Sequence, residues 1–394
     1  MKSYKKYIPP LIIFLWLIFF SNIGLSAQNA GFDTTQFHPM YVKSDDGNFS
    51  LNIGLYTQFR YNFNIRSDVP DSIDNISRGY NLARTRLFFE GNMTDKFYYH
   101  FRTNINPSGN FEFFVAFLQY NIKNGMYLRI GRQFMALGRE DWIYPQDLAA
   151  IEFSANDFTY ALWSSFGFQF GHTTSDKFRY WFGIGNGAYG GRRTFPAPKD
   201  SDLTLTTRLE YNIVGDNWGI WGDMLGRKGQ PFGMMAGLGV GQLLRRDDEA
   251  RLTDPKSGTQ VNLDFSVSGD GFHFFTQGIL TSLQFDEGVG NDNTTGGVYS
   301  TFGYWLSKKW FSYARFDYIS NGDREDINED YVSPGIGISL YPFTWSNRYR
   351  FTLEYNHLTN PVNNTLVQPD GQLGVIESSY GPQSSIRFQA QFGF

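Results

Sequence analysis

The feature that most constrains this chain is a hydrophobic pattern with a period of two, sustained over long segments. Between residues 49 and 65, one set of alternating positions is apolar: Leu51, Ile53, Leu55, Phe59, Tyr61, Phe63 and Ile65. The positions between them hold Asn52, Gly54, Tyr56, Gln58, Arg60, Asn62 and Asn64. Successive side chains of a β-strand point to opposite sides, so this pattern predicts a strand with one apolar and one mainly polar face. Such a strand is longer than the about 3–10 residues usual in globular proteins.

The same alternation recurs along the rest of the chain. It is clear at residues 203–213, 261–267, 350–356 and 386–394. A strand with one apolar and one polar face suits a barrel that has lipid outside and water inside. A soluble β-sandwich also allows the pattern, but aromatic residues make up 18% of this chain. Membrane barrels place many aromatic side chains at the two interfaces of the bilayer, which favours the barrel.

The connections between these segments alternate between tight turns and long loops, which is the arrangement of outer-membrane barrels. Counting the hairpins predicts about 16 strands, with 14 to 18 allowed. The predicted strands are 49–65, 80–92, 97–105, 111–122, 126–134, 165–172, 178–188, 203–213, 231–244, 259–268, 272–285, 297–306, 310–319, 331–341, 349–358 and 383–394. The stretch 218–229 is interpreted as an elaborated turn, because a strand there would make the total odd. The predicted fold is an all-β, transmembrane antiparallel β-barrel over residues 49–394.

The N-terminal residues predict export from the cytoplasm. Three lysines stand within the first six residues, an apolar stretch follows at residues 8–20, and a Leu-Ser-Ala sequence occupies residues 25–27. This is the pattern of a cleavable signal peptide over residues 1–27. An uncleaved membrane anchor is the alternative. Residues 28–48 then form an N-terminal periplasmic segment.

Composition excludes several other classes of protein. After residue 25 no run approaches the roughly 18 apolar residues of a membrane-spanning helix. The cysteine count of 0 removes disulfides, thiolate metal sites and cysteine nucleophiles. With Lys+Arg 34 and Asp+Glu 38, the chain lacks the basic character of a nucleic-acid-binding protein. The five histidines match no metal motif, and no Ser-His pair is indicated. We therefore expect no enzymatic activity, no cofactor and no metal.

Arginines recur on the predicted polar faces of the strands. The candidate pore-lining residues are Arg60, Arg84, Arg86, Arg102, Arg129, Arg208, Arg315, Arg350 and Arg387. Fixed positive charge in a narrow channel raises the local concentration of anions. Alternatively, the arginines pair with Glu90, Glu112 or acids of the loops and only rigidify the interior. Both interpretations place these side chains inside the barrel.

The longest connection in the first half of the chain, residues 135–164, is a candidate constriction loop. Its candidate acids are Glu140, Asp141, Asp147 and Glu152, which stand among several aromatic residues. A loop of about 30 residues is usually functional or disordered, and its aromatic content argues against disorder. We expect the loop to fold inward and narrow the channel. A packed extracellular cap is the alternative.

Three segments carry a resemblance to a known family. They are residues 82–87 (Leu-Ala-Arg-Thr-Arg-Leu) leading to Glu90-Gly91, residues 131–134 (Gly-Arg-Gln-Phe) and the terminal residues 388–394 (Phe-Gln-Ala-Gln-Phe-Gly-Phe). The chain resembles the phosphate-selective porin O and P family of Gram-negative outer membranes, in particular its divergent Bacteroidetes-type members. The resemblance implies an outer-membrane porin whose C-terminal strand is recognised by the outer-membrane assembly machinery. It does not imply phosphate selectivity, because the family's usual loop sequence after Gly131 is not reproduced.

These features predict an outer-membrane porin of a Gram-negative bacterium for passive diffusion of small hydrophilic solutes, with anions favoured if the arginines act on solutes. Barrels of about 16 strands leave an aqueous channel, whereas about 8 strands leave room only for side chains. The alternative function is a barrel that anchors surface loops for binding or adhesion. The expected partners are outer-membrane lipids, the assembly machinery and the solutes, and a homotrimer is a candidate assembly.

Overall fold

The computed structural model describes residues 30–32, 40–67, 69–70, 74–105, 111–173, 175–186, 203–215, 218–245, 255–288, 290–320, 330–344, 346–360, 373–376 and 381–393. The signal peptide predicted at residues 1–27 and the terminal Phe394 lie outside these residues.

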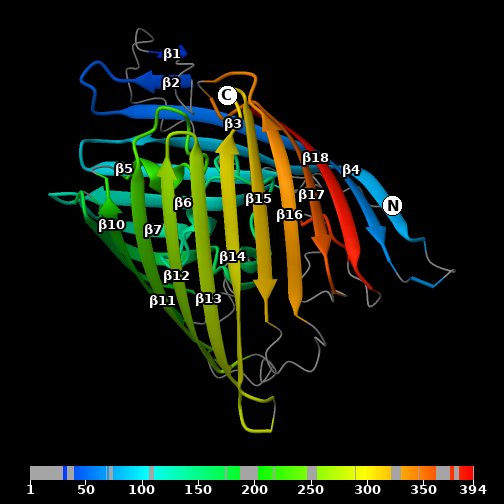
Figure 1. The fold of residues 1–394 in the computed structure, drawn as a ribbon. Helices are drawn as coiled ribbons and strands as arrows, with labels where there is room; N and C mark the ends of the chain where they lie inside the picture. The colour runs from blue at the N-terminus through cyan, green and yellow to red at the C-terminus, as the bar shows by residue number, and fades with distance from the viewer. Residues whose placement is uncertain are drawn as a thin grey trace, which may run out of the picture.

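Strands β3 to β18 close into a single antiparallel barrel (Figure 1). Each pairs with its neighbour along the chain, and β18 closes on β3 with Phe388 opposite Tyr61. The strands are β3 Ser50–Arg66, β4 Ile76–Asn92, β5 Phe97–Ile105, β6 Phe111–Asn121, β7 Met126–Phe134, β8 Ser164–His172, β9 Phe178–Asn186, β10 Leu203–Val214, β11 Gly233–Leu244, β12 Ser257–Gly269, β13 Phe272–Gln284, β14 Asn293–Trp305, β15 Trp310–Ile319, β16 Tyr331–Leu340, β17 Arg350–Leu358 and β18 Gln383–Gly393. The predicted all-β barrel of about 16 strands is confirmed.

Two strands begin four residues earlier than the sequence pattern predicted. β4 starts at Ile76 rather than residue 80, and β14 starts at Asn293 rather than residue 297. Both extensions lie next to long loops and are rich in polar residues and glycine. At these ends the strands remain paired beyond the apolar band of the outer wall. The hydrophobic alternation therefore ends a few residues before the backbone hydrogen bonds do.

The N-terminal segment adds a small sheet to the start of the barrel. β1 (Ala30–Phe32) pairs with β2 (Met40–Lys43), and β2 pairs with the first residues of β3, where Met40 lies opposite Ile53. The described part of segment 28–48 therefore extends the sheet at the tight-turn rim. Its placement in the periplasm remains a prediction.

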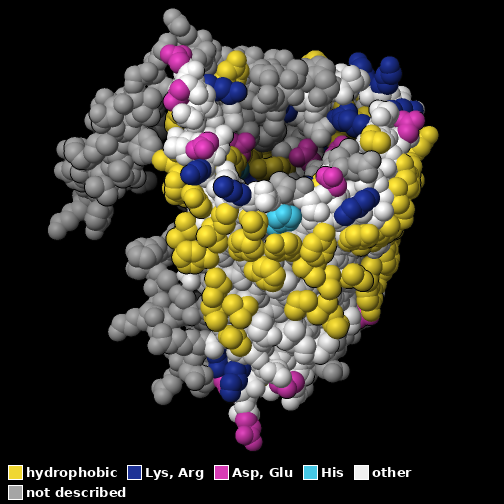
Figure 2. All heavy atoms as spheres, turned by 90° about the vertical axis from the view of Figure 1, so that its left-hand side faces the viewer, with side chains coloured by type: hydrophobic (Ala, Val, Ile, Leu, Met, Phe, Trp, Pro, Cys, Tyr) yellow, Lys and Arg dark blue, Asp and Glu magenta, His cyan; other side chains and the backbone are white. Residues whose placement is uncertain are grey.

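The wall of the barrel is apolar outside and polar inside. Phe59 and Phe388 are 52% and 45% exposed, whereas Gln58 and Arg60 between the outward residues of β3 are buried. Figure 2 shows the result on one face, where hydrophobic side chains form a broad band below a hollow bordered by charged groups. Such an apolar band is what a bilayer requires of a barrel wall, and it matches the predicted orientation of the strands.

Replacing Leu209 by Arg tests this orientation. Leu209 lies on the outer face near the middle of β10, so the variant should lose about 2–4 kcal/mol of folding free energy in lipid. The matched control is Leu244→Arg at the end of β11, where the cost should fall to about 0–1 kcal/mol. Urea titrations in lipid vesicles measure both. Equal costs at the two positions would contradict the placement of the apolar band.

Two connections fold into the barrel from opposite rims. One is the loop 135–163 between β7 and β8, which contains a 3-10 helix η2 (Glu140–Trp142) and helix α2 (Ala155–Tyr160). The other is the turn 215–232 between β10 and β11, which contains helix α3 (Gly219–Gly222). The interpretation of 218–229 as a turn rather than a strand is therefore confirmed. Among the described residues, the helices all fall short of the length and hydrophobicity needed to cross a membrane.

Candidate channel interior

The loop 135–163 lies against the arginine wall, by which we mean the predicted pore-lining arginines on the barrel strands. The Glu152 carboxylate accepts hydrogen bonds from the guanidiniums of Arg60 at 2.9 Å and Arg84 at 2.6 Å. All three side chains are almost completely buried. Burial alone would raise the pKa of Glu152, but the charges of Arg84 and Arg60 outweigh it and hold the pKa at about 2. The carboxylate therefore carries its charge at neutral pH and links the loop to β3 and β4.

Arginines of the later strands hold the backbone of the same loop. Arg350 donates to the carbonyl oxygens of Leu148 at 2.7 Å and Ala149 at 2.6 Å. Arg315 donates to the carbonyl of Glu152 at 3.1 Å. Carbonyl groups facing a barrel wall need such donors, because buried unpaired carbonyls are costly. The loop segment 148–153 is thus fixed from both sides.

Two further wall arginines pair with acids of the strands: Arg208 on β10 pairs with acids of β10 and β12, and Arg387 on β18 pairs with an acid of β17. Arg208 contacts Glu210 at 2.8 Å and Asp264 at 2.7 Å, and it also donates to the carbonyl of Leu137. Arg387 pairs with Glu354 on β17. Two of the nine predicted arginines, Arg60 and Arg84, therefore pair with a loop acid, as the alternative interpretation expected. Three others, Arg208, Arg315 and Arg387, pair with acids of the strands instead, and Arg350 donates to carbonyl groups of the loop.

The remaining three, Arg86, Arg102 and Arg129, are surrounded differently. The Arg102 guanidinium lies 4.9 Å from the ring centre of Phe134 and 5.1 Å from that of Tyr144. Arg86 lies 4.5 Å from the ring of Phe114, and Arg129 is held by aromatic rings and the side-chain oxygens of two glutamines. Within the described part of the chain, these three arginines form no ion pair. The side chain of Glu112 lies outside that part.

The four predicted loop acids occupy different environments. Glu140 accepts hydrogen bonds from the backbone N–H and the hydroxyl of Ser154, so it organises the loop itself. Asp141 is buried and interacts electrostatically with Arg208. Asp147 accepts a hydrogen bond from Asn347 at 2.9 Å, and burial raises its pKa to about 7. Of the four acids, Glu152 is the one that forms an ion pair with the wall in the described structure, to Arg60 and Arg84.

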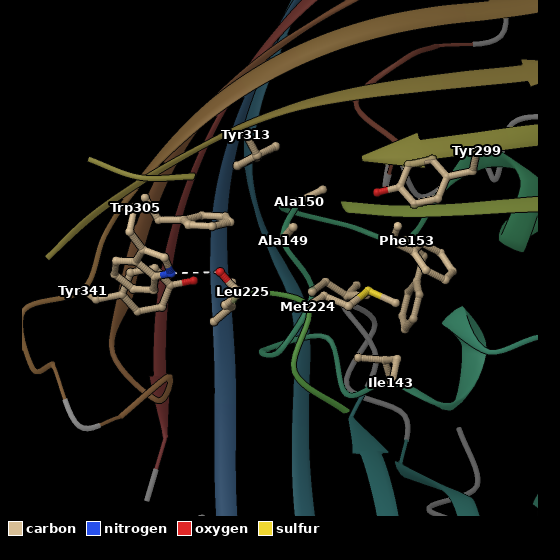
Figure 3. Close-up of a cluster of buried hydrophobic side chains, with 13 residues drawn as sticks. Ile143, Ala149, Ala150, Phe153, Met224, Leu225, Tyr299, Trp305, Tyr313 and Tyr341 are labelled. Carbon is tan, nitrogen blue, oxygen red and sulfur yellow. Dashed lines mark hydrogen bonds between the residues drawn. The ribbon is translucent and has the colours of Figure 1, made fainter. Parts of the chain in front are cut away.

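An apolar cluster inside the barrel joins the loop to the turn from the opposite rim. Ile143, Ala149 and Phe153 of the loop pack with Met224 and Leu225 of the turn and with aromatic residues of the strands (Figure 3). The indole N–H of Trp305 on β14 donates to the carbonyl of Leu225 at 2.8 Å. Arg139 donates to the carbonyl of Trp221, and the backbone N–H of Met224 donates to that of Asp147. The candidate constriction therefore has two parts, and the sequence pattern indicated only the loop.

A cavity of about 490 Å³ remains between the inward-folded segments and the wall formed by β5 to β9. Its lining includes Arg102, Arg129 and Arg179 from the wall and Trp142, Tyr144 and Trp221 from the loop and the turn. Asn92, Asn121 and Thr173 place it toward the tight-turn rim. Arg179 is not among the predicted pore-lining residues, because aromatic residues occupy both faces of β9 and conceal its alternation.

The described residues offer no group of three or more His, Asp and Glu side chains that could hold a metal ion. His100 interacts with Glu90 at 2.8 Å, and Tyr98 donates to the same carboxylate. This small network sits beside the cavity. It joins the neighbouring strands β4 and β5.

Comparison with known proteins gives a fold and no close relative. No family model matches the chain, and no curated protein does. Three similar solved structures are the trimer form of in-vitro folded OmpT of Vibrio cholerae, the outer membrane channel DcaP of Acinetobacter baumannii, and OmpF of Salmonella typhi in complex with daunomycin. Their sequence identities are 12%, 13% and 10%, and their TM-scores are 0.54, 0.55 and 0.57. The matches cover 87%, 92% and 89% of this chain and 99%, 100% and 99% of those chains.

Identities this low show the fold alone. The chain has the general porin-like architecture of a closed, 16-stranded antiparallel barrel. Membership of the phosphate-selective porin O and P family is a separate matter and remains a proposal.

Proposed function

We propose that this chain is an outer-membrane porin of a Gram-negative bacterium that lets small hydrophilic solutes diffuse passively. The observation that carries the proposal is a closed barrel whose outer wall is apolar and whose interior is lined by charged and polar side chains. A wall of this kind is stable in a bilayer, and about 16 strands leave room for an aqueous passage. No catalytic group takes part in this proposal.

The structural neighbours support the same function. OmpT is described as an outer membrane protein and DcaP as an outer membrane channel. The three segments that resemble the phosphate-selective porin O and P family support membership of that family, although phosphate itself is not part of the proposal. The OmpT structure in its trimer form supports a homotrimer for this chain as well. Native mass spectrometry of the detergent-solubilised protein tests that assembly.

The passage follows the side of the barrel where the loop covers the wall least. Wall arginines hold loop segment 148–153 against the strands around β15, β17, β3 and β4, while a cavity remains beside β5 to β9. Arg102 lines this cavity, and Arg86 lies next to it. Neither guanidinium has an acidic partner in the described structure. Their charge is uncompensated locally, which favours anions in a narrow, low-dielectric passage.

Replacing Arg86 and Arg102 by Gln should therefore shift the ion preference toward cations. Reversal potentials in a salt gradient measure the shift, which should be large enough to change the sign of the preference. Arg78→Gln is the matched control, because Arg78 is exposed near the long-loop rim. Exposed charges are screened beyond about 8–10 Å at physiological salt. If the Arg78 variant shifts the potential as much as the double variant, selectivity does not depend on these interior arginines.

Swelling of liposomes that contain the purified protein tests the function itself. Monosaccharides should enter and cause swelling, and the rate should fall steeply for larger oligosaccharides, because the inward-folded loop narrows the passage. Liposomes reconstituted with heat-denatured protein provide the baseline. A correctly folded barrel that gives no swelling above this baseline would contradict the proposed function.

A further inference from the structure

We propose that the cavity beside β5 to β9 is a binding site for small planar aromatic carboxylates. This inference rests on the proposed porin function, because the ligand would be a solute that enters the barrel. It goes beyond passive diffusion, because it assigns a solute class and a place where that solute is held.

The cavity is positively charged. Three guanidiniums line the cavity, those of Arg102, Arg129 and Arg179, and no Asp or Glu of the described chain does. The Nε atoms of Arg102 and Arg179 are buried and have no hydrogen-bond partner among the described residues. A buried cation with an unused donor is costly unless an anion or an acceptor reaches it. Glu90 is already engaged by Tyr98 and His100 and lies outside the lining.

Aromatic rings surround these three charges. Phe134 and Tyr144 lie over the Arg102 guanidinium, Phe117 lies 4.0 Å from that of Arg129, and Trp218 lies 4.1 Å from that of Arg179. Stacking against a ring occupies the flat face of a guanidinium and leaves its N–H edge to donate. A carboxylate can accept two parallel hydrogen bonds from such an edge.

The size and the aromatic walls of the cavity suit a flat ring. Trp142 of the loop packs edge-to-face against Trp181 of β9 at 5.3 Å and against Trp221 of the turn at 6.0 Å. Flat apolar walls of this kind suit a ring, which packs well against other rings in offset or edge-to-face arrangements. The volume of about 490 Å³ lies within the range of small-molecule sites, about 300–1,000 Å³. A hydrated inorganic anion would leave these aromatic walls unused.

Isothermal titration of the detergent-solubilised full-length protein with benzoate tests the site. Benzamide has the same ring without the charge, and acetate has the charge without the ring. Benzoate should bind at least about tenfold more tightly than either, since charged hydrogen bonds and ring packing each contribute that much. If benzoate binds no more tightly than benzamide and acetate, the inference is wrong.

Variants locate the site within the barrel. Arg102→Gln and Arg179→Gln should each weaken benzoate binding by about tenfold or more, whereas Arg78→Gln should leave it unchanged. The gel mobility of unheated samples shows whether each variant is folded. If a variant is not folded, the comparison of benzoate, benzamide and acetate on the unaltered protein decides whether the site exists. Unchanged binding in both folded cavity variants would overturn the assignment.

Titration does not require conduction, so the two proposals fail separately. A barrel that swells liposomes but does not prefer benzoate contradicts this inference alone. A barrel that binds benzoate but admits no sugar contradicts the proposed diffusion function alone.

Discussion

Deleting residues 140–155 should raise the single-channel conductance severalfold. This segment supplies Ile143, Ala149 and Phe153 to the apolar cluster inside the barrel, and it includes the backbone that Arg350 holds. The deletion is feasible because the loop leaves and rejoins the wall at neighbouring positions, where the N–H of Met135 donates to the carbonyl of Trp163. Recording in planar bilayers measures the change. Loss of the segment leaves the strands and their pairing intact.

A Gly-Ser segment of equal length is the matched control for this deletion. This variant keeps the length of the loop but lacks the side chains that pack and form ion pairs. Its current should therefore fluctuate between the level of the unaltered protein and that of the deletion variant. If the deletion variant is folded and its conductance is unchanged, the loop does not restrict the passage and the two-part constriction is wrong.

Replacing Glu152 by Gln should destabilise the folded barrel by about 3–5 kcal/mol. The substitution keeps the size of the side chain but removes the anion that Arg60 and Arg84 share, and both guanidiniums remain buried. Removing one partner of a buried ion pair leaves an uncompensated charge, which is the source of this cost. Urea unfolding in lipid vesicles, followed by tryptophan fluorescence, measures the difference.

Glu210→Gln is the matched control. Glu210 is also buried and pairs with Arg208, but that arginine retains Asp264 at 2.7 Å. Its loss should therefore cost clearly less than the loss of Glu152. Equal costs for the two variants would show that Glu152 is not the main electrostatic link between the loop and the wall.

The barrel could be predicted from the sequence because strand alternation is a local property. Residues such as Phe59 and Arg60 fall on opposite faces wherever the strand lies, so the pattern alone orients each side chain. Boundaries at the rim were less predictable, as the early starts of β4 and β14 show. Pairing there depends on the neighbouring strand rather than on hydrophobicity.

The partners of the interior charges could not be predicted in the same way. All four loop acids were reasonable candidates to meet the arginine wall, but the conformation of the loop decides which of them reaches it. Ser154 begins helix α2 by accepting from the backbone N–H of Asp157, and Glu140 is bound to Ser154. This local arrangement turns Glu140 back into the loop, while Glu152 faces Arg60 and Arg84.

The turn 215–232 shows a different limit of the sequence. The requirement for an even number of strands correctly indicated a connection here, yet nothing in its own pattern shows that Met224 and Leu225 are buried. Those residues are covered by loop 135–163 and by Trp305 of β14, which are distant in sequence. Burial of a connection is a tertiary property, and local alternation carries no information about it.

The most direct test of the account is single-channel recording of the unaltered protein in a planar bilayer with a salt gradient. The structure predicts stepwise insertions with a steady, restricted open level, and a reversal potential on the anion side because Arg86 and Arg102 are uncompensated. A folded, heat-modifiable barrel that produces no current steps above the bare bilayer would contradict the claim that this interior is a channel.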